Sequence, residues 1–366
     1  MTTVLISGAS VAGPALALNL RAHGFDVTVV ERAPALRPGG HAVDVRGAAL
    51  DVADRMGILP QLQAMRTRMR GMSMLDADGN ELFRSEEYAA SSGRLDSPDL
   101  EVLREDLTGL LHRRSAEAGV EYVFDDTVTA LTPLDHGVRA EFQHGAAREF
   151  DLVVGADGLH SATRRLVFGP EEAFVHHLGV YVAVYTMENI LGLDEWQVWV
   201  QAPGAGGGIY PARGNTELRV NLGFESGPIE GFHRDRQAQR AELARRYAGL
   251  GWEFPRLIEG ALAAPDFYCD AMAQVKMDTW SRGRVTLLGD AGYCASPLSG
   301  QGTSLALIGA WILAEELGRL PVDAAPAAYE TRMRPFAELN QALVKNEPGS
   351  PEADAAIEFA KSAIRV

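Results

Sequence analysis

Residues 284–307 contain the residue types that can bind a polyol together with a flat polar ring. An apolar run from Val285 to Leu288 leads into Asp290, and a loop with Pro297 and two glycines follows before an apolar helix. The Asp290 carboxylate can accept hydrogen bonds from hydroxyl groups, and the free N–H groups at the start of the helix can face the polar edge of a ring. This pattern predicts a flavin site.

A second glycine-rich turn lies near the start of the chain. A buried strand, Val4 to Ser7, precedes Gly8-Ala9-Ser10-Val11-Ala12-Gly13, and a helix then leads to a second strand that ends at Glu31. This order is typical of the βαβ unit that binds dinucleotides, with the pyrophosphate on the helix N-terminus and the acid on the adenosine ribose. Ser10 replaces the usual middle glycine, but serine is small and its hydroxyl can donate to a phosphate.

Two further stretches indicate a function only when they are considered together with these motifs. Residues 151–164 read as a strand that enters Gly-Ala-Asp157-Gly and a helix start, which alone would be an ordinary turn. Leu100 to Leu111 reads as a helix that carries Arg104, and an arginine on a helix is usually a surface residue.

Together the motifs resemble the class A, single-component FAD-dependent aromatic monooxygenases, over roughly residues 4 to 320. The matching segments are Gly8 to Gly13 with Glu31-Arg32, the Asp157-Gly158 turn, and Gly289-Asp290 with Pro297 and Gly300-Gln301-Gly302. The compact length looks most like the branch of tetracycline-inactivating and polyketide-tailoring enzymes. The resemblance implies an FAD enzyme that uses NADPH or NADH and O2 to hydroxylate an aromatic or polycyclic substrate through a flavin C4a-hydroperoxide.

The resemblance also implies roles for single residues. The FAD pyrophosphate would lie on Gly8, Ser10, Val11, Ala12 and Gly13. The adenosine half would contact Glu31, Arg32 and the backbone of Val128. The flavin half would contact Arg46, Arg104, Asp290, Pro297, Gly300, Gln301, Gly302 and Thr303, with the Pro297 loop over flavin C4a. Asp157 falls in the motif that the resemblance links to both FAD and NAD(P)H. No side chain is nominated as acid or base.

The expected fold is α/β, with a doubly wound, Rossmann-like FAD-binding domain and a discontinuous antiparallel-sheet substrate domain. The FAD-binding domain would comprise residues 1–70, 105–172 and 276–318, and the substrate domain residues 71–104 and 173–275. Residues 319–366 would form a C-terminal helical segment, with a helix from about 352 to 364. Gly71 to Phe83 reads as a hairpin, Val180 to Glu225 as strands broken by the glycine run 204–208, and 234–250 as a helix.

Aromatic residues on the expected strands are candidates for a substrate pocket, although aromatic residues on strands are core by default. The candidates are Tyr185, Trp196, Tyr210 and Phe224. The glycine run 204–208 would be a mobile rim or a hairpin loop.

Composition limits the remaining function classes. The net charge of -15 argues against nucleic acid or an anionic membrane as partner. Two cysteines give no disulfide framework, and the nine histidines show no metal-ligand spacing, so we expect no metal, a cytoplasmic location and a monomer or homodimer. A reductase or dehydrogenase of the same fold and a non-catalytic flavin-binding homologue remain alternatives. A flavin-dependent halogenase is disfavoured because its tryptophan motif is missing.

Overall fold

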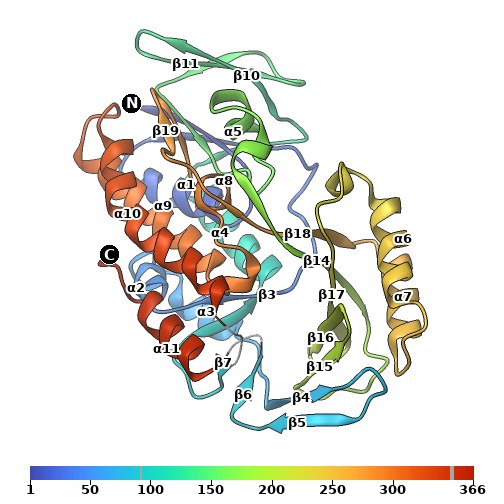
Figure 1. Ribbon diagram of the computed structural model, residues 1–366. Coiled ribbons are helices and arrows are strands. Elements are labelled where there is room, and N and C mark those ends of the chain that lie inside the picture. The colour runs from blue at the N-terminus through green and yellow to red at the C-terminus, as the bar shows by residue number, and fades with distance from the viewer. Residues whose placement is uncertain (91–92, 347–349) are drawn as a thin grey trace.

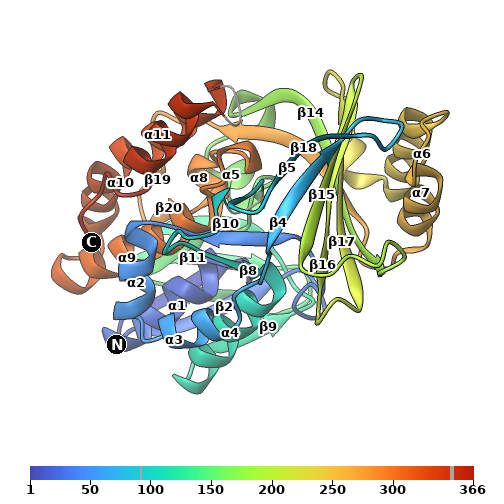
Figure 2. The ribbon, with the colours of Figure 1, turned by 90° about the horizontal axis from the view of Figure 1, so that it is seen from below.

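The computed structural model describes residues 1–90, 93–346 and 350–366. Figures 1 and 2 show a parallel sheet surrounded by helices beside a large, mainly antiparallel sheet. None of the described helices has the length and apolar character that crossing a membrane requires.

The first sheet is parallel except at one edge, with the order β19-β20-β13-β1-β2-β9. Its strands are β1 (Thr3–Ser7), β2 (Asp26–Glu31), β9 (Glu121–Phe124), β13 (Leu152–Gly155), β19 (Ser281–Arg282) and β20 (Val285–Leu287). Alternate residues face opposite sides, so Val4 and Ile6 of β1 enter the large core under the helices while Leu5 enters a smaller core. The sheet therefore separates two apolar layers.

Helices cover one face of this sheet and a small antiparallel sheet covers the other. The main helices are α1 (Ala12–Ala22), α2 (Ala48–Arg55), α4 (Arg104–Glu117), α9 (Gly302–Arg319) and α10 (Ala325–Ala342). The opposite layer contains β10 (Val128–Leu134), β11 (Gly137–Phe142), β12 (Arg148–Phe150) and α5 (Ala162–Val167). The predicted α/β class is confirmed, with a β-layer on the face where a doubly wound sheet usually has helices.

The second sheet has the order β18-β14-β17-β16-β15-β4-β5. Its strands are β4 (Gly71–Leu75), β5 (Glu81–Ser85), β14 (Val175–Glu188), β15 (Trp196–Ala202), β16 (Ala205–Ala212), β17 (Glu217–Glu225) and β18 (Tyr268–Val275). Helices α6 (Arg236–Tyr247) and α7 (Phe254–Ala263) cover its outer face around a separate apolar core (Figure 1). The inner face looks toward the first sheet (Figure 2). Two separate cores support our proposed division into FAD-binding and substrate domains.

Short elements complete the chain. They are β3 (Ala42–Val45), β6 (Tyr88–Ala89), β7 (Gly93–Arg94), β8 (Leu100–Leu103), α3 (Leu59–Ala64), α8 (Asp290–Tyr293), α11 (Pro351–Ala360) and the 3-10 turns η1 (Glu171–Ala173), η2 (Phe232–Arg234), η3 (Pro297–Ser299) and η4 (Leu343–Lys345).

Three local predictions were wrong or incomplete. Residues 100–103 form strand β8, which pairs with β3, and the helix begins only at Arg104. The glycine run breaks the strands only at Gly204, in the turn between β15 and β16. Gly206 to Gly208 lie inside β16, where a Cβ at Gly208 would come within 2.6 Å of the Trp199 ring. Helix α10 was not predicted, since Pro335 lies within it and proline usually ends a helix.

Candidate functional site

The N-terminal turn is closed by backbone packing that only glycine permits. Gly8 has a φ of +112°, and a Cβ there would lie 2.4 Å from the carbonyl oxygen of Ala156, the residue that follows the neighbouring strand β13. A Cβ on Gly13 would lie 1.9 Å from the Gly8 carbonyl oxygen. Helix α1 then starts at Ala12 with no side-chain cap, so its first N–H groups, which include those of Val11 and Ala12, are available to an anion.

Glu31 fixes the other side of this turn. Its carboxylate accepts the N–H groups of Ala9 at 2.9 Å and Ala33 at 3.0 Å. The backbone of Asp126 donates to the Glu31 carbonyl at 3.1 Å, which brings Val128 at the start of β10 close to the end of β2. Arg32 is exposed. Each carboxylate oxygen can accept further hydrogen bonds, so the arrangement fits an adenosine ribose.

Arg104 connects the N-terminal turn to the flavin half of the expected site. Its guanidinium donates to the Ser10 hydroxyl at 2.7 Å. Burial, and then repulsion from Arg37, lower its pKa to about 10, so it stays charged at neutral pH; Asp290 and Glu31 are close enough to counter this shift. Strand β8 positions the residue by ending directly at the start of α4.

Asp290 is the first residue of a short helix that follows the parallel sheet. Gly289 turns the chain with a φ of +65°, and Asp290 opens α8 directly after the buried strand β20. The Asp290 side chain is exposed to solvent, yet burial among surrounding groups raises its pKa. We infer that the carboxylate faces a recess bordered by Arg104, and we call this recess the hollow. Pro297 and Leu298 of the following loop are exposed too.

Arg46 reaches the same loop from a distant segment. Its backbone N–H donates to the Ser304 hydroxyl at 3.1 Å, and its guanidinium pairs with Asp44 at 2.8 Å. A Cβ on Gly300, whose φ is +63°, would lie 3.7 Å from Arg46 Nη1. The structure therefore brings Arg46 beside the loop that precedes α9.

Gln301 supplies a test of whether this loop fits a bound polar group. The residue is fully buried, and neither amide atom has a hydrogen-bond partner among the described residues. An unpaired buried amide costs free energy, and its usual explanation is a missing partner. Gly302 and Thr303 form the uncapped first turn of α9 beside it. These donors fit the polar edge of a flavin ring.

Asp157 has a local role. Its carboxylate accepts the Ser161 hydroxyl and, at 2.9 Å, both the N–H and the hydroxyl of Thr163, so it caps α5. Its main chain lies against Gly8, where a Cβ would be 3.0 Å from the Asp157 Cα. We infer that Asp157 shapes the turn under the cofactor instead of binding the cofactor with its side chain.

Two of the four aromatic candidates point away from this site. Tyr185 and Phe224 lie in the core under α6 and α7, where the Tyr185 hydroxyl donates to the Leu257 carbonyl at 2.6 Å. Trp196 lies near the sheet edge, with Arg84 at 4.0 Å over its ring. Tyr210 is buried on the inner face and accepts the Ala42 N–H at 2.6 Å. Only Tyr210 of these four reaches toward the first sheet.

The inner face presents a different row of residues, which the sequence analysis missed. The strand register places five residues side by side across the sheet: Tyr268, Val184, Asn221, Gly208 and Trp199. Tyr268 is 40% exposed although burial raises its pKa, and the Arg37 guanidinium lies 4.7 Å over its ring. Because side chains alternate between the two faces of a strand, Val184 could have been assigned to the inner face from its neighbour Tyr185. Tyr268 could not, because the sequence spacing does not show that β18 pairs with β14.

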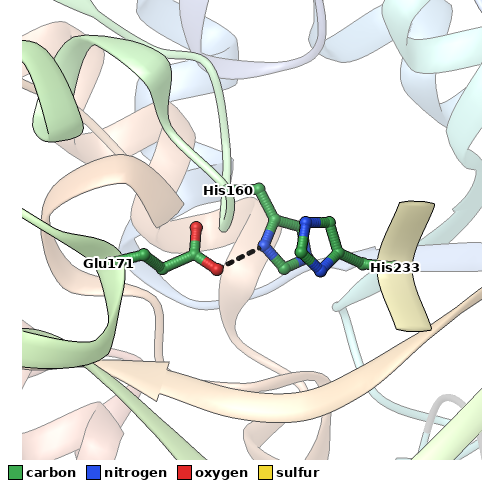
Figure 3. Close-up of side chains that lie close together, drawn as sticks. All are labelled: His160, Glu171 and His233. Carbon is green, nitrogen blue, oxygen red and sulfur yellow. Dashed lines mark hydrogen bonds and ion pairs between the residues drawn. The ribbon is translucent and has the colours of Figure 1, made fainter. Parts of the chain in front are cut away.

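A histidine cluster lies at the junction of the two sheets (Figure 3). His160 Nδ1 bonds to Glu171 at 2.9 Å and Nε2 to Asp270 at 3.0 Å, while the His233 ring stacks on His160 at 4.1 Å. Among the described residues, His160, Glu171 and His233 bring three possible metal-ligand atoms within 4.8 Å of one another. Burial disfavours charge on His160, but its bonds to Asp270 and Glu171 outweigh burial and raise its pKa to about 9. We therefore interpret the ring as an imidazolium shared by two carboxylates.

This ion pair predicts a pH-dependent stability. The pKa of His160 is raised in the folded protein. Its contribution to the free energy of unfolding is therefore complete below its ordinary value of 6.5 and is lost as the pH rises through about 9. We expect His160→Gln to lower the urea midpoint at pH 6 and to have little effect at pH 10. The loss at pH 6 should not exceed about 3 kcal/mol, because the ring is partly solvated. An equal effect at both pH values would contradict the imidazolium assignment.

Comparisons with known proteins identify the family of this chain. The family model described as "FAD binding domain" matches residues 1–343. A flavin-dependent monooxygenase from an unknown prokaryotic organism is 40% identical over 93% of this chain and 88% of its own. An uncharacterized protein of Mycobacterium tuberculosis is 53% identical over 95% of this chain and 94% of its own.

Solved structures agree with this result. The crystal structure of tetracycline destructase Tet(51) has a TM-score of 0.89 and 34% identity, covering 100% of this chain and 99% of its own. Tetracycline destructase Tet(55) has a TM-score of 0.87 and 38% identity, covering 99% and 97%. With the glycine turn, Arg104 and the Asp290 loop assembled around one hollow, these likenesses show that the chain belongs to the FAD-binding monooxygenase family and is a FAD-dependent monooxygenase.

Proposed function

We propose that this monooxygenase uses NADPH or NADH with O2 to hydroxylate a flat aromatic or polycyclic substrate of polyketide type. The observation that carries the proposal is the inner face of the second sheet, where Gly206 pairs with Gly223 and Gly208 with Asn221. Gly206 and Gly223 keep this part of the face low. The Trp199 ring lies against Gly208 at one end of the row, and Tyr268 stands at the other end. A low floor between two aromatic residues suits a planar ligand.

The residues present fit FAD. The first turn of α1 and Ser10 would hold the pyrophosphate, Glu31 the adenosine ribose and Asp290 the ribityl chain. Arg104, which stays charged beside Ser10, would offset phosphate charge. When bound and reduced, FAD supplies the oxygen-activating chemistry.

The chain itself would orient the substrate and exclude water. The exposed Pro297 and Leu298 would form the wall opposite the inner sheet face, and their apolar surface would shield the reacting edge of the ring. The uncapped N–H groups of Gly302 and Thr303 and the buried Gln301 amide would stabilise negative charge on the ring's polar edge.

The names of relatives support the substrate class. Two similar solved structures are named tetracycline destructases, and a FAD-dependent monooxygenase of Sarocladium schorii is 32% identical over 91% of this chain. Tetracycline is therefore the first acceptor to test, followed by simpler polycyclic phenols.

The test is oxygen incorporation. We expect one acceptor from a panel of tetracyclines and polycyclic phenols to stimulate NADPH or NADH oxidation and to yield a product that carries one atom of ¹⁸O from ¹⁸O2. If an acceptor is consumed with reduction of a double bond and no ¹⁸O, the reductase alternative is correct. If neither nicotinamide reduces the enzyme with any acceptor, the proposal fails.

A further inference from the structure

The hydroxyl group of Tyr268 donates its one hydrogen bond to the carboxylate of Asp270. Its O–H donates to Asp270 Oδ2 at 2.7 Å, and Asp270 Oδ1 accepts the N–H of Ala271 at 2.8 Å. His160 Nε2 donates to both oxygens of the same carboxylate, at 3.0 and 3.1 Å. A phenol group whose O–H already donates a hydrogen bond can only accept further hydrogen bonds.

Tyr268 is placed where a substrate would meet it. It belongs to the inner-face row and pairs with Val184. Its interaction with Arg104 puts it on the same hollow as Asp290, which also interacts with Arg104. Tyr268 is 40% exposed, so part of this residue is accessible to a ligand.

The charge on Asp270 is fixed by the histidine cluster. Its carboxylate bonds to His160 and Tyr268, and His233, Tyr181 and Cys269 lie close enough to interact with it. Glu171 pairs with His160 and Arg164, and Arg37 lies over the Tyr268 ring. Burial acts to raise the Asp270 pKa, but the bonds from His160 outweigh burial and hold that pKa below its usual range. An ionised Asp270 cannot donate, so the Tyr268 proton cannot reverse its direction while His160 is an imidazolium.

We propose that Tyr268 is a specificity-determining residue that accepts a hydrogen bond from a hydroxyl group of the substrate, and that His160 and Asp270 are the positioning residues that keep its own proton turned away. The inference rests on the proposed function, because it names the polar group that the flat substrate must carry next to the sheet.

The proposal can be tested by measuring ligand binding, with no catalytic turnover required. The probes are phenol and anisole, which differ in the one hydroxyl proton, added to FAD-loaded full-length protein with ¹³Cζ-labelled tyrosine. The Tyr268→Phe variant identifies the Tyr268 signal. We expect phenol to shift that signal and to bind on the order of tenfold more tightly than anisole. In Tyr268→Phe, the two affinities should become equal. Equal affinities in the unaltered protein, or no response to either probe, would overturn the proposal.

The positioning role has its own readout. In His160→Gln, Asp270 loses its cationic partner, so its pKa rises and it becomes protonated on mild acidification. Tyr268 then accepts a hydrogen bond from the protonated Asp270 and can donate its own hydrogen bond toward the hollow. The preference for phenol should therefore fall as the pH drops from 8 to 5 in His160→Gln and stay constant in the unaltered protein. His233→Gln, which loses the stacked ring and the acceptor for Arg234 Nε but leaves the bond from His160 to Asp270, is the matched control and should also stay constant.

A pH-independent preference in His160→Gln would show that His160 does not position Tyr268. If His160→Gln does not fold, Asp270→Asn decides the question, because an amide can either donate or accept and the preference should fall at every pH. Failure of ¹⁸O incorporation would refute the proposed function and leave these affinities measurable, so the two failures are distinguishable.

Discussion

Gly13→Ala is expected to destabilise the fold by more than about 3 kcal/mol and to abolish FAD retention. The added Cβ would lie 1.9 Å from the Gly8 carbonyl oxygen and 3.3 Å from Ile6 Cγ2. Both contacts belong to the strand and turn on which α1 packs, and a backbone oxygen cannot rotate away as a side chain can. The helix must therefore move off β1. Alanine has a higher helix propensity than glycine by about 1 kcal/mol. The expected loss of stability is therefore opposite in sign to the effect of helix propensity.

The measurement is the urea midpoint of FAD-free protein together with the FAD content after purification. Gly227→Ala is the matched control, since a Cβ at Gly227 meets nothing within 4 Å. That variant should remain within about 1 kcal/mol of the original protein. A Gly13→Ala protein that unfolds at the original midpoint would show that α1 and β1 have room to separate, and the close-packing argument would be wrong.

Local patterns predicted the parts of the site that lie within one short segment. The strand, turn and helix around Gly8 and Gly13 appear in the structure as β1, the turn and α1, because each residue's neighbours in sequence are also its neighbours in space. The step from β20 to Asp290 was predicted for the same reason. Those roles that depend on the cofactor itself stay predictions.

Contacts between distant segments could not be predicted. Arg104 looked like a surface residue until its bond to Ser10, 94 residues away, was visible. Tyr185 and Tyr268 differ in the face they occupy, and only the pairing of Val184 with Tyr268 reveals it. The glycine run read as a loop because glycine favours turns, whereas Gly208 accommodates the Trp199 ring. Tertiary packing outweighed local propensity at each of these positions.

Asp290→Asn should weaken FAD binding and stabilise the empty protein. The carboxylate would accept charge-assisted hydrogen bonds from the ribityl hydroxyls, and their loss should raise the FAD dissociation constant about 10- to 100-fold. Fluorescence quenching of added FAD measures this constant. Asp135→Asn, a change to an exposed turn residue, is the control and should bind FAD normally.

The gain in stability follows from the sign of the Asp290 pKa shift. Burial raises this pKa above its ordinary value of 3.8, and Cys294 and Arg104 only partly oppose the effect of burial. The folded protein therefore retains the proton more strongly than the unfolded chain, so stability falls as the pH rises from about 4 through the raised pKa. Asparagine carries no charge, so the melting temperature of FAD-free Asp290→Asn should exceed the original at pH 7, and the difference should shrink toward pH 4. A variant that binds FAD normally would remove Asp290 from the site. A variant with no gain in melting temperature at pH 7 would instead show that solvent in the hollow already compensates the charge.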